Sequence, residues 1–378
     1  MPDSAGRLTV LQVLPDLHSG GVERGVLEVG RALVEAGHRS LVISAGGPLV
    51  QQLTAEGSRH LTVPIGVKSP TTLTHIRTLR QVVSRERVDI LHARSRLPAW
   101  VSLLAWQTMP ASRRPRLVTT VHGLHSVSQY SSVMTRGEAV IAVSRTVRDY
   151  IRENYPNCPD HRVTVIPRGV DPDEFPYGFA PPDGWGERFF ADFPECRGKR
   201  FLTLAGRLTR LKGHHDFLRV LECTEADVHG LIVGGEDPLR VAYAAELRKA
   251  VADRGLSDRV TFTGHRVDVR EILSVSDVVL SLSTKPESFG RSVLEALSLG
   301  RPVVGYDHGG VGEVLSDLFP EGRTPMSRPE LAGECVNRVL RDRSVPGPVQ
   351  GYELRTMLHK LLNLYVRLAA CRDSRVAA

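Results

Sequence analysis

Residues 206–213, of sequence GRLTRLKG, place two cations five residues apart, directly after an apolar run. Ligands of open α/β sheets bind outside the carboxyl ends of the strands, so Arg207 and Lys212 would project toward a ligand. An arginine guanidinium binds two phosphate oxygens side by side, and a lysine ammonium adds a point charge. The segment therefore suits a diphosphate, although taken alone it fits a solvated basic turn better.

A second segment, ESFGRSVLE, carries a glutamate at each end, Glu287 and Glu295. Its glycine followed by good helix formers marks a helix start. At about 1.5 Å of rise per residue the two carboxylates lie about 12 Å apart, too far to share a metal or to act as a glycosidase pair. They could instead accept hydroxyl hydrogen bonds on either side of a pyrophosphate held at the helix N-terminus. The backbone amides facing that anion would be those of Phe289, Gly290 and Arg291. A nucleotide sugar has this layout, with ribose, diphosphate and hexose in a row.

The elements that must hold these segments alternate between short apolar runs and helical patterns. In the first half, β-branched runs such as 8–14, 40–43 and 117–121 are separated by helical patterns such as 22–36. The same alternation restarts near residue 200. Strands separated by helices imply βαβ units and a parallel sheet that is covered on both faces.

The length of 378 residues predicts at least two domains at about 150 residues each. The stretch 167–198 is rich in proline, glycine and aromatic residues, which is typical of an ordered linker. We therefore expect an α/β chain of two doubly wound Rossmann-like domains, residues 1–168 and 169–350, that face each other across a crevice. A last amphipathic helix within 351–371 has no further strand to cover, and we expect it to complete the first domain.

The net charge of +7 lies in the first 160 residues, which hold 19 Lys and Arg against 12 Asp and Glu. Such an asymmetry favours an anionic partner, such as a phosphorylated acceptor or an acidic membrane surface. A soluble surface rich in arginine explains the charge equally well. Nucleic acid is disfavoured, because the arginines are scattered without interleaved aromatic residues.

The five cysteines include no Cys-x-x-Cys pair, which argues against a disulfide framework or a zinc site and for a reducing compartment. The longest apolar runs fall far short of the roughly 20 residues that span a bilayer. The N-terminus has Asp3 and no basic region ahead of a long apolar stretch, unlike a signal peptide. We expect a cytoplasmic protein, with peripheral contact at the inner membrane surface as an option.

Several motifs in the same order resemble those of the family 4 retaining glycosyltransferases, the group 1 enzymes of GT-B fold. The resemblance covers essentially the whole chain and is strongest in the second domain. Bacterial lipopolysaccharide and cell-envelope sugar transferases belong to this group. The motifs are GGVER at 20–24, VIPRGVD at 165–171, GRLTRLKG at 206–213, the Glu287-x7-Glu295 spacing and GGVGE at 309–313.

The resemblance implies a role for each charged residue of the second domain. Glu295 would hold the ribose hydroxyls, and Glu287 would hold the hydroxyls of the donor sugar. Arg207 and Lys212 would bind the diphosphate.

In the first domain, the turn at Gly20 and Gly21 would close on the donor phosphates. His122 follows a strand and, by the resemblance, would contact the donor sugar near its C6 hydroxyl, although a lone histidine is more often a satisfied core residue. Ser144 ends a further strand, where a helix N-cap is at least as good an interpretation.

Three residues are candidates for contact with the acceptor. His92 and Arg94 follow another strand, where a basic loop leading into a helix is an equally good interpretation. Arg168 stands where the family commonly has asparagine. It either directs a positive charge toward an anionic acceptor or is merely a surface residue.

The expected reaction is transfer of a hexosyl group from a nucleotide diphosphate sugar to an acceptor hydroxyl, with retention at the anomeric carbon. A UDP-sugar is favoured and GDP-mannose is the alternative; the expected acceptor is a lipopolysaccharide core or another phosphorylated, lipid-linked glycan. The sequence has no Asp-x-Asp motif at a strand end facing the crevice, so the fixed cations would neutralise the diphosphate, and neither a metal nor a cofactor is expected.

Three other functions compete with this one. A sugar-nucleotide epimerase on the same fold would turn over the donor without an acceptor. A non-catalytic sugar-nucleotide-binding module is disfavoured, because it would not need the intact set of motifs that this sequence has. A dinucleotide-dependent oxidoreductase is disfavoured, because Gly20 and Gly21 do not fit the Gly-x-Gly-x-x-Gly spacing.

Overall fold

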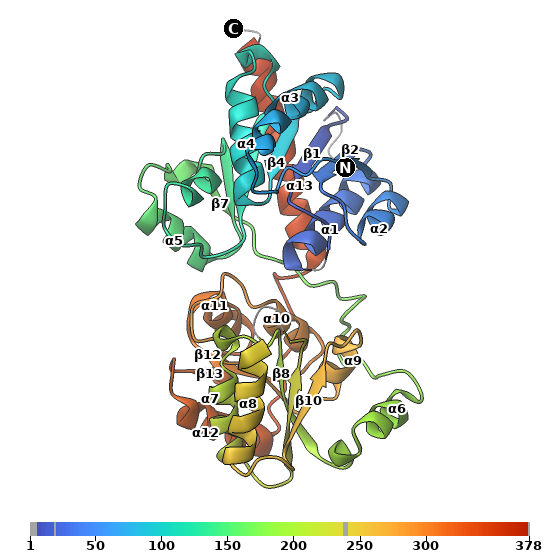
Figure 1. Cartoon of the computed structure of the whole chain (residues 1–378), viewed down its shortest axis with the longest axis vertical. Helices are drawn as coiled ribbons and strands as arrows, with labels where there is room; N and C mark the ends of the chain where they lie inside the picture. Colours follow the sequence, from blue (N-terminus) through green and yellow to red (C-terminus); the bar gives the residue numbers. More distant parts are fainter. Residues whose placement is uncertain (1–5, 19, 237–240, 377–378) are drawn as a thin grey trace. The chain divides into compact units, whose positions relative to one another are not determined.

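A computed structural model describes residues 6–18, 20–236 and 241–376, and the chain forms two compact units (Figure 1). Unit 1 comprises residues 1–167 and 355–378, and unit 2 comprises residues 168–354. Each unit is built on its own parallel β-sheet with helices on both faces. The predicted fold class, two doubly wound Rossmann-like domains, is confirmed.

The sheet of unit 1 has the strand order β3-β2-β1-β4-β5-β6-β7, as far as the structure describes it. All neighbouring strands are parallel, and the chain reverses its direction across the sheet between β1 and β4. The elements of unit 1 are β1 (Thr9–Val13), α1 (Gly21–Glu35), β2 (Arg39–Ser44), α2 (Val50–Ala55), β3 (Arg59–Thr62), α3 (His75–Arg85), β4 (Ile90–Ala93), α4 (Arg96–Gln107), β5 (Arg116–Val121), β6 (Ala139–Ala142), α5 (Arg145–Asn154), β7 (Val163–Val165) and α13 (Leu354–Val376).

The helix α13 returns to unit 1 after the whole of unit 2 and packs on the same sheet face as α1. On that face the Gln12 amide donates to the Val26 carbonyl of α1, and the His92 ring contacts the Tyr365 hydroxyl of α13. The Arg116 guanidinium at the start of β5 donates to the carbonyl of Leu368. These contacts attach α13 across β4 and β5.

The sheet of unit 2 has the order β10-β9-β8-β11-β12-β13 among the described residues, so its reversal lies between β8 and β11. Helices α7 and α8 pack side by side over it (Figure 1). The elements of unit 2 are α6 (Trp185–Asp192), β8 (Arg200–Ala205), α7 (His214–Glu222), β9 (Val228–Val233), α8 (Val241–Asp253), β10 (Val260–Gly264), α9 (Val269–Ser274), β11 (Val278–Ser281), α10 (Arg291–Ser298), β12 (Val303–Tyr306), α11 (Gly309–Leu318), β13 (Arg323–Thr324) and α12 (Pro329–Asp342).

The stretch that we predicted as an ordered linker contains a helix, α6, which belongs to the core of unit 2. Its Trp185 and Phe189 rings stack at 5.1 Å and pack against Phe201, Leu231 and other buried residues. The aromatic residues of the linker thus serve the hydrophobic core, which the proline and glycine content had obscured.

The buried contact between His92 and Tyr365 gives a test of how α13 holds to unit 1. Both side chains are fully buried, and the His92 Nδ1 atom lies 2.6 Å from the Tyr365 hydroxyl. Tyr365→Phe removes the hydroxyl, so the buried His92 ring loses one of its hydrogen-bond partners. We expect a loss of about 1–3 kcal/mol in the free energy of unfolding, measured by denaturant titration. Tyr130→Phe, at an exposed ring, is the control, and equal stabilities for the two variants would contradict the contact.

A pair of glycines tests whether the turn before α7 is sterically fixed. Gly198 and Gly213 both have a φ of +73°, but a Cβ at Gly198 would meet open space, whereas one at Gly213 would clash with the Leu282 carbonyl. Gly198→Ala should cost about 1–2 kcal/mol for the left-handed backbone alone. Gly213→Ala should cost more, because the Leu282 strand end must also move. Equal losses in the free energy of unfolding would show that the turn adapts freely.

Candidate functional site

The loop after β8 is fastened to its neighbours at several backbone positions. The Gly206 amide donates to the Val233 carbonyl at 2.8 Å, and the Thr284 amide after β11 donates to the Leu211 carbonyl at 2.8 Å. Residues 210–212 form a short 3₁₀ turn, and Gly213, in the left-handed conformation, is the N-cap of α7. The segment GRLTRLKG therefore lies at the point of the sheet where the strand order reverses, where open α/β sheets bind their ligands.

Lys212 and Glu287 meet at this point. The Lys212 ammonium donates to Glu287 Oε1 at 2.8 Å, and the two side chains are 26% and 19% exposed. The Ser283 hydroxyl donates to the same carboxylate oxygen. Glu287 Oε2 accepts no hydrogen bond from the described residues, so one oxygen of the carboxylate is fixed and the other is open to a ligand.

The backbone around Glu287 is held by the loop after β12 and by the first turn of α11. The Gly310 amide donates to the Glu287 carbonyl at 2.7 Å, and the His308 Nε2 atom lies 2.8 Å from the Ser283 carbonyl. Sequence reasoning missed both Ser283 and His308. The available signal was their position, since each polar side chain lies two residues after the end of a largely buried strand.

Glu295 lies in the second turn of α10, four residues after Arg291. The Arg291 Nε atom donates to Glu295 Oε1 at 2.9 Å, and the glutamate side chain is 15% exposed. Gly290 is the N-cap of α10, and Phe289 is buried with its ring 6.1 Å from that of Tyr352. The predicted helix start at this motif is therefore observed, and Arg291 orients the carboxylate of Glu295.

Arg207 differs from Lys212 in having an exposed side chain that makes no hydrogen bond or ion pair with the described residues. The neighbouring Arg210 instead pairs with Glu246 on α8. Of these two arginines, Arg207 is thus the one left available to an incoming anion.

The candidate acceptor residue Arg168 is half-buried and belongs to unit 2.

A neutral histidine lies beneath the cationic loop. His214 is fully buried, and burial lowers its pKa to about 4. Its Nδ1 atom is 3.4 Å from the Tyr243 hydroxyl. At neutral pH His214 therefore adds no charge beneath this loop.

The other predicted donor-site residues belong to unit 1. Gly20 is the N-cap of α1 and Gly21 is its first residue, and both are exposed. His122 directly follows β5 and is half-buried. The Ser144 hydroxyl accepts from the Val147 amide at 3.0 Å, so the N-cap interpretation of this serine is confirmed.

His92 and Arg94 do not lie on an open surface, which argues against the predicted contact with an acceptor. His92 is fully buried, with Nδ1 on Tyr365 and Nε2 2.7 Å from the Thr120 hydroxyl. Arg94 is 4% exposed and donates to the Gln12 amide oxygen; burial lowers the pKa of its guanidinium. Both side chains point to the sheet face that α13 covers, and we leave them out of the proposed acceptor site.

Metal-ligating clusters and membrane-spanning helices are absent from the part of the chain that the structure describes. Its residues contain no group of three or more His, Cys, Asp and Glu side chains that could hold a metal ion. None of its helices is long and apolar enough to cross a membrane.

Both halves of the chain match known families. Residues 19–174 match the family described as Glycosyltransferase Family 4, and residues 187–349 match Glycosyl transferases group 1. The first match ends at residue 174 and the second begins at residue 187, shortly after the division between the two units.

Three curated relatives show what the chain is similar to. It is 28% identical to a subunit of human phosphatidylinositol N-acetylglucosaminyltransferase, over 84% of this chain and 64% of that protein, so it spans less than two thirds of that relative. It is 26% identical to N-acetyl-alpha-D-glucosaminyl L-malate synthase of Bacillus anthracis, over 76% of each chain. It is 28% identical to the lipopolysaccharide core biosynthesis mannosyltransferase LpsB of Rhizobium meliloti, over 49% of each.

Solved structures agree with these relatives. A glycosyltransferase from Rickettsia africae is 27% identical, with a TM-score of 0.81, over 96% of this chain and 99% of that one. The Anabaena protein HepE, solved in complex with UDP, shares the fold with a TM-score of 0.74 at 19% identity, over 98% of this chain and 100% of that one. The resemblance drawn from the sequence motifs is confirmed, and the chain belongs to the group 1 glycosyltransferases of GT-B fold.

Proposed function

We propose that the chain transfers a hexosyl group from a nucleotide diphosphate sugar to an acceptor hydroxyl, with retention at the anomeric carbon. The observation that carries the proposal is the Lys212–Glu287 pair where the strand order of unit 2 reverses. A cation for the leaving diphosphate and a carboxylate for the sugar hydroxyls are fixed there side by side, each by contacts within unit 2.

The donor would bind with its ribose at Glu295 and its hexose at Glu287. Since Arg291 occupies Glu295 Oε1, the Oε2 atom is left for the two ribose hydroxyls. In the same way, Lys212 and Ser283 occupy Glu287 Oε1 and leave Oε2 for the sugar. The backbone amides of Phe289, Gly290 and Arg291 would face the diphosphate between the two carboxylates. Gly20, Gly21 and His122 of unit 1 are proposed as further donor contacts.

In the proposed reaction the bond between the anomeric carbon and the β-phosphate oxygen breaks while the acceptor oxygen bonds to the same face of that carbon. The leaving phosphate oxygen takes the proton of the acceptor hydroxyl. Lys212 and Arg207 would stabilise the charge that develops on the diphosphate, which is the part of catalysis that raises the rate of the chemical step. We propose that these fixed cations replace a metal ion.

The acceptor is proposed to be anionic. The excess of basic residues in the first 160 residues supports this class. So do the names of two relatives, which refer to phosphatidylinositol and to L-malate. A lipopolysaccharide core, as in the name of LpsB, is the acceptor that we favour, with Arg168 as a contributing charge and a UDP-sugar as donor.

A ligand screen tests the proposal directly. The thermal unfolding of the purified protein is measured with UDP, GDP and ADP sugars, because a ligand that binds the native state raises its stability by mass action. We expect one nucleotide to stabilise the protein clearly above the other two. That donor is then incubated with candidate acceptors, and the anomeric configuration of the product is read by NMR. No stabilisation by any nucleotide sugar, or an inverted product, would overturn the proposal; turnover of the donor without an acceptor would favour an epimerase.

Loss of the Lys212 charge should act on the chemical step. Lys212→Ala should lower kcat about a hundredfold to a thousandfold, the usual cost of removing one preorganised stabilising group, with a smaller effect on the donor KM. Arg207→Lys should be less active than the wild type although it keeps the charge, because an ammonium cannot supply the two parallel hydrogen bonds of a guanidinium.

The control for both variants is Arg210→Ala, which removes a cation of the same loop that already pairs with Glu246. This variant should keep its activity. A raised KM with an intact kcat in Lys212→Ala would show that the residue only holds the donor.

Turnover should persist in the presence of EDTA, because the proposed charge stabilisation comes from side chains of the chain itself. Initial rates are compared with and without the chelator, and again after addition of Mg²⁺ or Mn²⁺. An activity that disappears in EDTA and returns with either metal would show that a divalent ion neutralises the diphosphate.

A further inference from the structure

The topology of unit 1 leaves one strip of its sheet with little cover. Right-handed crossovers place α1 and α2 on one face, over the half of the sheet that runs from β1 to β3. The crossovers from β4 to β7 run in the opposite direction across the sheet, so α4 and α5 lie on the other face. Over β4 to β7 the first face is covered, among the described elements, by α13.

One helix is too narrow to cover this half of the sheet. Four strands at about 4.8 Å spacing are wider than a helix of about 10 Å diameter. Because α13 is attached over β4 and β5 by His92 and Arg116, the uncovered strip lies toward the edge strand β7. The arrangement of strands and helices thus predicts a hollow between α13 and β7.

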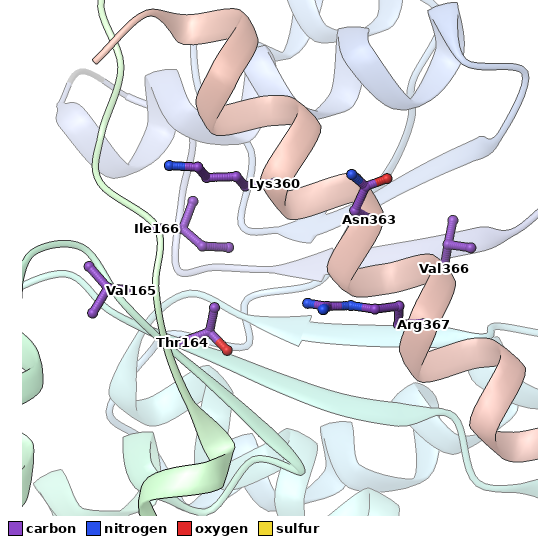
Figure 2. Close-up of a pocket in the computed structure, with 7 residues that line it drawn as sticks. All are labelled: Thr164, Val165, Ile166, Lys360, Asn363, Val366 and Arg367. Atoms are coloured by element: carbon purple, nitrogen blue, oxygen red, sulfur yellow. The ribbon is translucent and has the colours of Figure 1, made fainter. Parts of the chain in front are cut away.

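A cavity of about 400 Å³ occupies this position, and Figure 2 shows its lining. Ile166 and Val366 supply apolar surface, and Thr164 and Asn363 supply neutral polar groups. From α13, Lys360 and Arg367 extend toward the side of the β7 residues (Figure 2). The full lining is Thr164, Val165, Ile166, Lys360, Asn363, Val366 and Arg367, all of unit 1.

The charges of the cavity are of one sign and are not neutralised. Lys360 and Arg367 are exposed, and neither makes an ion pair or a hydrogen bond with the part of the chain that the structure describes. No acidic residue belongs to the lining. Other cations of the chain, such as Arg116 with Glu138 and Arg200 with Asp227, have carboxylate partners. Lys360 and Arg367 instead give this hollow a positive charge that an anionic ligand would neutralise.

We propose that this cavity is a binding site for an organic phosphate. Arginine and lysine are the usual cationic partners of phosphate oxygens, and a hydroxyl and an amide nearby can donate further hydrogen bonds. Lys360 and Arg367 are seven residues apart, which is about 10 Å along a helix, so the ligand is elongated and lies along α13. Its apolar part rests on Ile166 and Val366. The site stands independently of the proposed transferase reaction.

Such a phosphate can come from a lipid headgroup or from a soluble ester, and the experiment separates the two. In one arm, short-chain dihexanoyl phosphatidic acid is titrated into the full-length protein by calorimetry, with dihexanoyl phosphatidylcholine as the neutral comparison. In the other arm, the protein is sedimented with phosphatidylcholine vesicles that contain or lack phosphatidic acid. Hydrogen exchange with each probe then reports whether residues 164–166 and 360–367 become protected.

The test variant is the double substitution Lys360→Glu and Arg367→Glu. The matched control is Arg77→Glu with Arg80→Glu, which changes the net charge equally through two exposed cations of α3. A second variant, Thr164→Val, removes the neutral donor without a change of charge. Thermal unfolding confirms that all the variants are folded.

We expect the wild-type protein to bind saturably in at least one arm. The dissociation constant should rise about tenfold or more in the test variant, which corresponds to about 1.4 kcal/mol, and it should be unchanged in the control. Binding of the soluble ester identifies a site for a free phosphate; binding of vesicles alone identifies a headgroup at a bilayer. Absence of binding in both arms, equal loss in the test and control variants, or no protection of the lining would overturn the proposal.

Discussion

The ion pair between Lys212 and Glu287 is the interaction on which the candidate site of unit 2 depends. It joins the loop after β8 to the loop after β11, the two strands between which the sheet reverses its order. A half-buried pair of this kind gains from neighbouring donors, here the Ser283 hydroxyl, because the low local dielectric strengthens a satisfied network. The same contact leaves one carboxylate oxygen of Glu287 open. The same few side chains therefore contribute both to the stability of unit 2 and to the proposed ligand binding.

The two parallel sheets, and the position of the unit 2 motifs directly after strands, could be predicted from the sequence because both follow local patterns. Apolar runs separated by helical periodicity imply parallel sheets, and the motifs of unit 2 follow directly on such runs. The contacts that support Glu287 could not be predicted in this way. His308 and Gly310 lie more than 20 residues after Glu287 in the chain, and only the pairing of β11 with β12 brings their loops together.

The prediction for His92 and Arg94 shows a second limit. Both follow the rule that polar residues at strand ends face a ligand, but side chains alternate between the two faces of a strand. His92 and Arg94 share the face that α13 covers, and α13 comes from the far end of the chain. The helix itself was expected from its amphipathic pattern, whereas the strand to which each of its residues packs was not.

We propose that unit 2 binds a nucleotide diphosphate sugar with its ribose on Glu295. The most direct test is the dissociation constant of the donor that the wild-type protein binds, measured by calorimetry for wild type, Glu295→Ala and the control Glu246→Ala. Glu246 is a carboxylate of α8 that pairs with Arg210. We expect Glu295→Ala to weaken binding about tenfold or more, since the carboxylate oxygen that accepts from the ribose hydroxyls is lost. Glu295→Ala should stay folded, and Glu246→Ala should bind the donor as the wild type does. An unchanged dissociation constant in folded Glu295→Ala would contradict the proposal.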